Sequence, residues 1–171
     1  MGLEGFFSPK SVAIVGASQK KGKVGYEILT NMIKAGFAGE IFPVNNKMDS
    51  IEGLKCYPDL KSIGKVPELV VVVIPAPAVP AVMQDCAKIG VKSVVIITAG
   101  FKEIGKEGAE IEKQVIRIAK QSGMRVIGPN CLGVIAPANK MNASFGGALP
   151  KAGKIGYLSQ SGALLAAILD M

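Results

Sequence analysis

The fold of this chain is decided by one stretch, Ser11-Val12-Ala13-Ile14-Val15-Gly16-Ala17-Ser18-Gln19-Lys20-Lys21-Gly22-Lys23-Val24-Gly25. Its apolar, β-branched start predicts a buried strand over Ser11–Val15. Gly16 follows, where the chain turns without a side chain in the way. Apolar residues then recur at helical spacing, at Val24, Ile28, Met32 and Ala35. A glycine turn that opens a helix presents free backbone N–H groups and the positive end of the helix dipole, so the stretch predicts a phosphate site.

The chain that follows alternates between strand and helix patterns. The expected strands are Ser11–Val15, Glu40–Asn45, Leu69–Ile74, Ser93–Thr98 and Arg125–Gly128, and the expected helices are Lys23–Ala35, Val79–Ile89 and Gly108–Ser122. The six consecutive apolar residues of Leu69–Ile74 suit a central strand covered on both faces. The alternation predicts an α/β fold, with a doubly wound parallel sheet and right-handed crossovers. Ligands on such sheets bind beyond the carboxyl ends of the strands, at the topological switch point.

The pattern changes after residue 133. Val134–Pro150 is rich in glycine and proline and predicts a loop or hairpin, whereas Lys154–Ser159 predicts a new strand and Ala163–Leu169 a helix. We therefore expect the sheet domain over residues 1–133, a hairpin or linker over 134–152, and the start of a second, truncated domain over 153–171.

Composition excludes several classes of function. The 171 residues are 49% apolar, which is enough for the core of one ordinary domain. There is no histidine, so this chain contains no histidine-based triad or histidine metal site, and we expect no metal. The three cysteines lack metal-ligand spacing and predict reduced thiols in the cytoplasm. No apolar run is long enough for a membrane span and no signal peptide is visible. The net charge of +7 comes from scattered residues, and tryptophan is absent, so we expect no nucleic-acid partner.

The glycine turn departs from the usual dinucleotide fingerprint, G-x-G-x-x-G followed by an acidic residue about 20 positions later. The glycines here are Gly16, Gly22 and Gly25, with Ser18 where the second glycine would stand. The second strand ends in Asn45-Asn46-Lys47 and offers no carboxylate for a ribose diol. A positive charge at this position fits a ribose phosphate, so NADP and coenzyme A (CoA) both remain open.

Four motifs carry a resemblance to a known family: Phe7-Ser8-Pro9-Lys10-Ser11-Val12-Ala13-Ile14-Val15-Gly16-Ala17-Ser18, Val73-Ile74-Pro75-Ala76-Pro77, Gly128-Pro129-Asn130-Cys131-Leu132-Gly133 and Gly153-Lys154-Ile155-Gly156-Tyr157-Leu158-Ser159-Gln160-Ser161-Gly162. In this order they resemble the N-terminal part of NDP-forming (ADP-forming) acyl-CoA synthetases, relatives of the succinyl-CoA synthetase α subunit. The resemblance spans nearly the whole chain. It implies a Rossmann-type CoA-binding domain, followed by the first βα unit of a flavodoxin-like domain.

The resemblance also implies which residues form the site. The implied CoA-binding residues are Gly16, Ala17, Ser18, Gln19, Lys20, Asn45, Lys47, Ile74, Pro75, Ala76, Thr98, Ala99 and Gly100. The candidates for a phosphate site are Asn130, Ser159, Ser161 and Gly162. In the family, the helix N-terminus at this serine motif receives the phosphoryl group of a phosphohistidine. Because that histidine is absent, we expect no catalytic residue in this chain, which would bind CoA without completing the reaction.

The implied reaction of the complete enzyme converts acyl-CoA, NDP and phosphate into an organic acid, CoA and NTP through a phosphoryl-enzyme intermediate. ATP or ADP and Mg would bind elsewhere, on further synthetase domains or on an ATP-grasp β subunit, in an oligomer in the cytoplasm.

Two other functions remain open: a stand-alone CoA- or nucleotide-binding regulatory module, and an NADP-binding oxidoreductase domain. Plainer roles also remain open, namely a simple turn at Gly16, a solvated lysine at Lys47, a strand breaker at Pro75–Pro77, an ordinary loop at Thr98–Gly100 and a helix cap at Ser159–Gly162.

Overall fold

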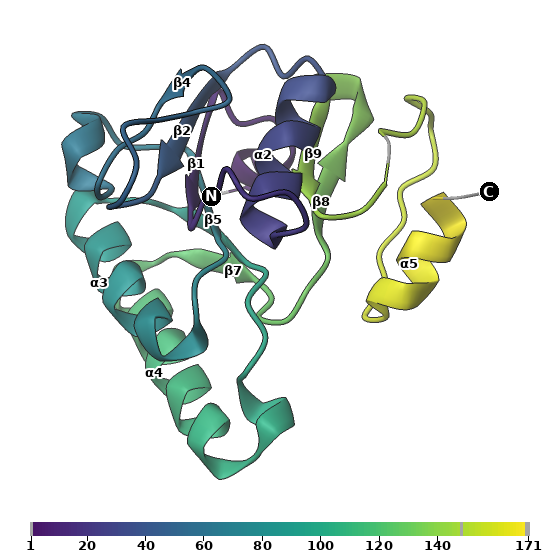
Figure 1. Cartoon of the computed structure of the whole chain (residues 1–171). Coiled ribbons are helices and arrows are strands. Elements are labelled where there is room, and N and C mark those ends of the chain that lie inside the picture. The colour runs from purple at the N-terminus through teal and green to yellow at the C-terminus, as the bar shows by residue number, and fades with distance from the viewer. Residues whose placement is uncertain (1, 148, 170–171) are drawn as a thin grey trace.

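The centre of the protein is a five-stranded parallel sheet, seen in a computed structural model that describes residues 2–147 and 149–169 (Figure 1). The strands lie in the order β2-β1-β5-β6-β7. Their bounds are β1 (Ser11–Val15), β2 (Glu40–Val44), β5 (Leu69–Val72), β6 (Ser93–Ile96) and β7 (Arg125–Ile127). The chain order reverses between β1 and β5, which places the switch point there. The sheet confirms the predicted doubly wound, Rossmann-type α/β class.

Helices cover both faces of the sheet. They are α2 (Val24–Lys34), α3 (Val79–Ile89) and α4 (Lys106–Ser122). Along β5, Val70 and Val72 belong to the apolar cluster with α3 and α4, whereas Leu69 and Val71 belong to the cluster with α2. Figure 1 shows α3 and α4 together on one side and α2 on the other. Both faces of the strand are thus buried, which is why the whole run is apolar.

A hairpin completes the layer that contains α2. It consists of β8 (Gly133–Ala136), the short 3-10 helix η4 (Pro137–Asn139) and β9 (Met141–Ser144). Met141 and Ala143 are fully buried in the cluster with α2. A hairpin is therefore present in the segment where it was expected, although the division into domains stays a prediction. The short helix α1 (Glu4–Phe7) adds Phe6 to the same cluster, whereas Phe7 is 46% exposed.

The connection from β2 to β5 contains a second, smaller hairpin that the sequence did not reveal. It pairs β3 (Ser50–Ile51) with β4 (Leu54–Lys55) through a two-residue turn at Glu52 and Gly53, which have φ angles of 51° and 77°. Strands of two residues are too short to show an alternating pattern. The 3-10 helix η1 (Lys61–Ile63) follows later in the same connection.

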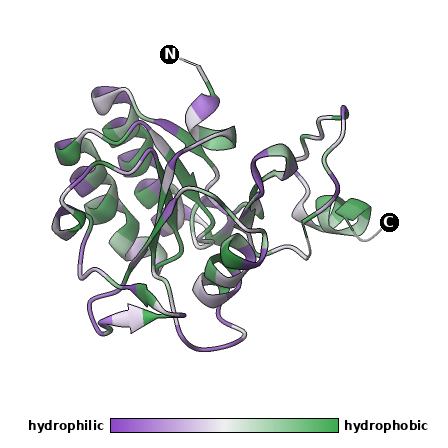
Figure 2. Ribbon diagram, turned by 90° about the horizontal axis from the view of Figure 1, so that it is seen from above, coloured by the Kyte–Doolittle hydropathy of each residue, from purple (hydrophilic) through white to green (hydrophobic). Residues whose placement is uncertain are grey.

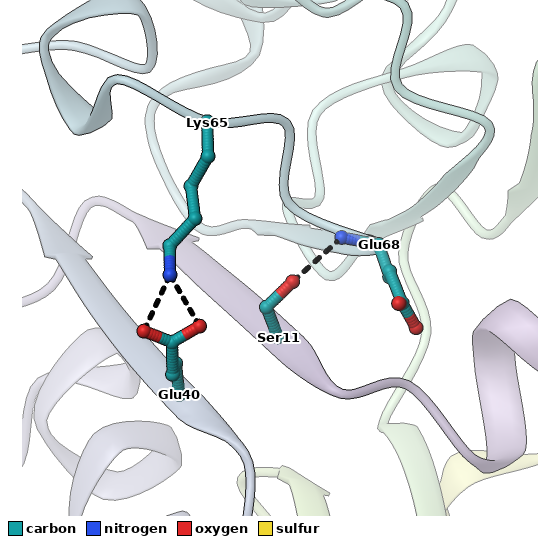
Figure 3. A network of polar contacts seen from close by, with 4 residues as sticks. All are labelled: Ser11, Glu40, Lys65 and Glu68. Atoms are coloured by element: carbon teal, nitrogen blue, oxygen red, sulfur yellow. Dashed lines mark hydrogen bonds and ion pairs between the residues drawn. The ribbon is translucent and has the colours of Figure 1, made fainter.

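The amino ends of the strands, on the side away from the predicted site, are held by polar contacts (Figure 3). The hydroxyl of buried Ser11 accepts a hydrogen bond from the Glu68 N–H at 3.1 Å, which joins β1 to the start of β5. Lys65 forms an ion pair with Glu40 at the start of β2. These contacts fix the connection between β2 and β5 and leave the opposite edge of the sheet to the loops of the candidate site.

The C-terminal segment differs from the prediction. Residues 154–159 form no strand, and Ile155 and Leu158 are 93% and 97% exposed. A strand needs a neighbour for its backbone hydrogen bonds, and the described residues offer none here. The predicted helix is present as α5 (Gly162–Leu169), which Figure 2 shows as mostly hydrophobic, at the side of the sheet domain. Among the described helices, none has both the length and the apolar character needed to cross a membrane.

Candidate functional site

Two glycines hold the turn after β1 tightly against its surroundings. Gly16 has a φ of +97°, and a Cβ atom added there would lie 2.7 Å from the Val73 carbonyl oxygen. A Cβ atom on Gly25, in the first turn of α2, would lie 2.0 Å from the Gly16 carbonyl oxygen. Both positions therefore exclude any side chain. The result is a bare backbone surface that leaves room for the close approach of a ligand, as a pyrophosphate requires.

The loop between Gly16 and α2 is shaped by its own side chains. The Ser18 hydroxyl accepts a hydrogen bond from the Lys20 N–H at 3.0 Å. The Gln19 amide donates to the Ser50 carbonyl at 2.7 Å and so ties the loop to the β3–β4 hairpin. Lys23 precedes α2 without a side-chain cap, so the N–H groups of Val24 and Gly25 remain available to an anion, whereas that of Tyr26 donates to the Lys23 carbonyl. Ser18 and Gln19, expected as CoA contacts, are at least partly engaged in holding the loop.

Two candidate residues follow β2: Asn45, whose side chain forms hydrogen bonds within the protein, and Lys47, whose side chain is exposed. The Asn45 amide donates to the Ala17 carbonyl at 2.8 Å, and its side-chain oxygen accepts from the Lys47 N–H at 2.9 Å. Asn45 therefore connects β2 to the glycine turn. Lys47 is exposed, as is Lys20. The positive charge expected near the ribose end of the ligand is thus free to meet it.

The segments after β5 and β6 lie against one another. The Thr98 hydroxyl donates to the Ile74 carbonyl at 2.7 Å, and a Cβ atom on Gly100 would lie 3.2 Å from that of Ala76. The Gly100 N–H donates to the Glu103 carboxylate at 2.6 Å, and this hydrogen bond lowers the pKa of Glu103. Ala76 belongs to the 3-10 helix η2 (Ala76–Ala78), and Glu103 to η3 (Lys102–Ile104). The structure thus brings together the segments Ile74–Ala76 and Thr98–Gly100, both expected to bind CoA. The Thr98 hydroxyl, however, is engaged in a hydrogen bond within the protein.

A cavity of about 650 Å³ opens at this edge of the sheet, a volume typical of small-molecule sites. Its lining consists of Val24, Val73, Ile74, Ile97, Thr98, Ala99, Asn130, Cys131, Leu132, Phe145, Gln160, Gly162, Ala163 and Ala166. The cavity joins expected CoA-binding residues to two of the expected phosphate-site residues, Asn130 and Gly162. None of the lining side chains is charged. Val24 links the cavity to the basic loop, because it begins α2 directly after Lys23.

Several wall residues of this cavity were not predicted. Phe145 follows β9, and Ala163 and Ala166 lie on α5. No sequence pattern marks these residues, because they reach the strand ends only through the placement of the hairpin and the C-terminal segment.

Cys131 lines the cavity as a protonated thiol. Its Sγ donates to the Ile96 carbonyl at 3.3 Å, and burial raises the pKa of the thiol to about 11. A nucleophilic cysteine needs a lowered pKa. The raised pKa of this thiol therefore argues against Cys131 as a nucleophile. Among the described residues, no group of three or more acidic, histidine or cysteine side chains is placed to hold a metal ion.

The serine motif forms the cap of α5. The Ser161 hydroxyl accepts from the Leu164 N–H at 3.2 Å, the usual N-cap contact, and the Ser159 hydroxyl accepts from the Ser161 N–H at 3.0 Å. Capping and phosphate binding are compatible, because a cap of this kind occupies one of the first N–H groups of a helix. The phosphate role of Ser159, Ser161 and Gly162 stays a prediction.

Comparison with known proteins relates the chain to one family. Residues 10–137 match the CoA binding domain family. The α subunit of ADP-forming acetate–CoA ligase I from Pyrococcus furiosus is 44% identical over 99% of this chain and 37% of its own length. The ADP-forming 4-hydroxybutyrate–CoA ligase of Nitrosopumilus maritimus is 46% identical over 95% of this chain and 24% of its own length. The chain thus spans 24–37% of the length of these two relatives.

A solved structure matches both the sequence and the fold. The dinucleotide-forming acetyl-coenzyme A synthetase 1 of Ca. Korarchaeum cryptofilum, in complex with phosphate and ADP, is 42% identical to this chain. The match covers 99% of this chain and 36% of that one, with a TM-score of 0.88.

Proposed function

Because this chain belongs to the CoA binding domain family, we propose that it binds CoA as the N-terminal portion of an ADP-forming acyl-CoA synthetase. The observation that carries the proposal is the continuity of the site. A side-chain-free glycine turn and an uncapped helix start adjoin an uncharged cavity of about 650 Å³. This arrangement matches a ligand with a polyanionic nucleotide end and a long, uncharged arm.

The proposed role of each residue in binding CoA follows from its position at the carboxyl ends of the strands. The backbone of Gly16–Lys20 and the start of α2 would hold the pyrophosphate, and Lys47 would meet the 3′-phosphate of the ribose. The segments Ile74–Ala76 and Thr98–Gly100 would line the path of the pantetheine arm. Asn45 would act indirectly, by holding the Ala17 carbonyl and hence the turn. Each exposed lysine would contribute no more than about 1 kcal/mol, because solvent screens its charge.

The complete enzyme would convert acyl-CoA, ADP and phosphate into an organic acid, CoA and ATP through a phosphoryl-enzyme intermediate. The ADP-forming names of the relatives support ADP over GDP. Asn130, Ser159, Ser161 and Gly162 would form the phosphate site at the start of α5. The phosphorylated histidine must come from elsewhere, since this chain has no histidine. ATP or ADP and Mg would also bind outside this chain, on fused domains or on an ATP-grasp β subunit.

The proposed context is a cytoplasmic oligomer. Burial raises the pKa of the Cys56 and Cys131 thiols and raises that of Cys86 to about 12, so these cysteines are unreactive and suit a reducing compartment. The proposed division is a CoA-binding domain over residues 1–133, a hairpin or linker over 134–152, and the beginning of a flavodoxin-like domain over 153–171.

Calorimetric titration of the chain with CoA, dephospho-CoA, ADP and NADPH tests the proposal. We expect CoA to bind about fivefold more tightly than dephospho-CoA, since the latter lacks the 3′-phosphate assigned to Lys47. A Lys47→Ala variant should remove this difference, whereas Lys113→Ala, on the outer surface of α4, should preserve it. Equal, millimolar binding of CoA, dephospho-CoA and ADP would contradict the proposal, and tighter binding of NADPH would favour an oxidoreductase domain.

A further inference from the structure

Phe145 is an aromatic side chain at the cavity that none of the expected site motifs contains. It follows β9 directly, lines the cavity and is 43% exposed. The Phe145 N–H donates to the Leu132 carbonyl at 3.4 Å, which attaches this position to another part of the cavity wall. The backbone around Phe145 therefore determines where this large, partly exposed side chain stands at the edge of the cavity.

A buried polar network holds the backbone on both sides of Phe145. The Asn31 amide of α2 donates to the Ser144 carbonyl at 3.0 Å and to the Gly146 carbonyl at 2.9 Å. The Ser144 hydroxyl donates to the Asn142 side-chain oxygen at 2.6 Å and accepts from the Gly146 N–H at 3.1 Å. Asn142 and Ser144 are 1% and 0% exposed. A fully satisfied buried network of this kind fixes one conformation of a segment.

The chemistry of the cavity indicates which part of a ligand Phe145 meets. Apart from Phe145, Gly162 and the polar residues Thr98, Asn130, Cys131 and Gln160, the lining is aliphatic, and it contains no charged side chain. The Thr98 and Cys131 side chains already donate to backbone carbonyls. Partners for an anion are confined to the Asn130 and Gln160 amides and the start of α5, where the phosphate site is proposed. Along the aliphatic wall, an uncharged arm with a small acyl group gains from burial. The phosphates of CoA itself would lie on the other side of Val24, at the basic loop.

We infer that Phe145 sets the size of the acyl group that the cavity accepts, and that Asn31 is the positioning residue that holds it in place. The inference rests on the proposed function, since it assumes that the acyl end of acyl-CoA enters this cavity. Phe145 limits the space available beyond the thioester. The acids named for the two relatives, acetate and 4-hydroxybutyrate, differ in chain length. A residue that limits the length of the acyl group would therefore distinguish substrates of this kind.

The test compares the affinities of CoA, acetyl-CoA, butyryl-CoA and hexanoyl-CoA for the chain by calorimetry. In the wild type, affinity relative to CoA should fall from acetyl-CoA to hexanoyl-CoA. Phe145→Ala should raise the relative affinity for hexanoyl-CoA at least tenfold, since each newly buried methylene contributes about fourfold. Phe145→Trp should act in the opposite direction and weaken butyryl-CoA. Asn31→Ala should relax the discrimination in the same direction as Phe145→Ala, an effect that a purely structural role would not produce.

Phe7→Ala is the matched control, since Phe7 is 46% exposed on α1 and is not part of the cavity. It should leave the order of acyl-CoA affinities as in the wild type. The inference is overturned if Phe145→Ala and Phe145→Trp both retain the wild-type ratios while CoA still binds. Failure of the wild type to bind unmodified CoA is a different result, which overturns the proposed function and the acyl-size role with it.

Discussion

Gly16 stands at a position where both the backbone angle and the surrounding space require glycine. Its φ of +97° is unfavourable for any other residue, and the Val73 carbonyl and the Ile74 side chain occupy the space that a Cβ atom would need. We expect Gly16→Ala to lower the free energy of unfolding by about 3 kcal/mol, since strain and the clash with a backbone carbonyl add together. Urea denaturation followed by circular dichroism measures the change.

Gly22 provides the control in the same loop. Its φ is +79°, but no atom lies within 4 Å of an added Cβ. Gly22→Ala should therefore cost only the backbone strain, about 1 kcal/mol. If the two substitutions cost the same, the close approach of the glycine turn to β5 does not contribute to stability, and the packing argument for Gly16 is wrong.

The residues of the site were easier to locate than to assign a role. The glycine turn, Lys47 and the segments after β5 and β6 could be located in the sequence because strand ends and glycines mark them. Asn45 and Thr98 lie where they were expected, but their side chains form hydrogen bonds to the Ala17 and Ile74 carbonyls. Such roles depend on which loops meet in three dimensions. Phe145 could not be identified at all, since it reaches the cavity through a hairpin that folds back over α2.

At the scale of elements, α2 joins the sheet to the β8–β9 hairpin, and Met32 lies at the centre of this contact. Met32 is 0% exposed and packs in the cluster that contains β1, β5 and the hairpin, whereas its neighbour Ile33 is 40% exposed. We expect Met32→Ala to lower the free energy of unfolding by 2–5 kcal/mol, the usual range for buried large-to-small substitutions. Ile33→Ala in the same helix should cost less than about 1 kcal/mol. Urea denaturation of both variants checks this, and equal costs would mean that α2 does not pack on the hairpin as described.

Elements were predictable where their own residues dictate them. The buried run of β1 and the stripe of α3 gave the observed bounds, Ser11–Val15 and Val79–Ile89. Helix α3 ends at Gly90, which has a φ of +89° and caps the last turn. The strand expected over residues 154–159 is the counterexample. Its sequence has strand propensity, but a parallel strand forms only beside a partner, and the described residues place none there.

At the scale of the whole molecule, the chain combines a well-packed body with a C-terminal segment that buries little. Both apolar clusters of the core come from residues 6–143. No residue of α5 is buried, and Leu164 is 51% exposed in a helix that is apolar almost throughout. Large exposed apolar surfaces usually mark contacts with other parts of an assembly. This asymmetry supports the proposed boundary between residues 152 and 153, because both apolar clusters that stabilise the fold lie on its N-terminal side.

A chain that ends at residue 152 tests this boundary. Since residues 153–169 bury almost no apolar surface, their removal should change the free energy of unfolding by less than about 0.5 kcal/mol in urea denaturation. It should also reduce self-association in analytical ultracentrifugation, because the exposed side chains of Ile155, Leu158 and Leu164 are removed. Affinity for CoA should persist, whereas discrimination among acyl-CoA lengths should weaken, since Gly162, Ala163 and Ala166 form part of the cavity wall. A loss of 2 kcal/mol or more would show that α5 belongs to the core of the first domain, and the boundary at 152 would then be wrong.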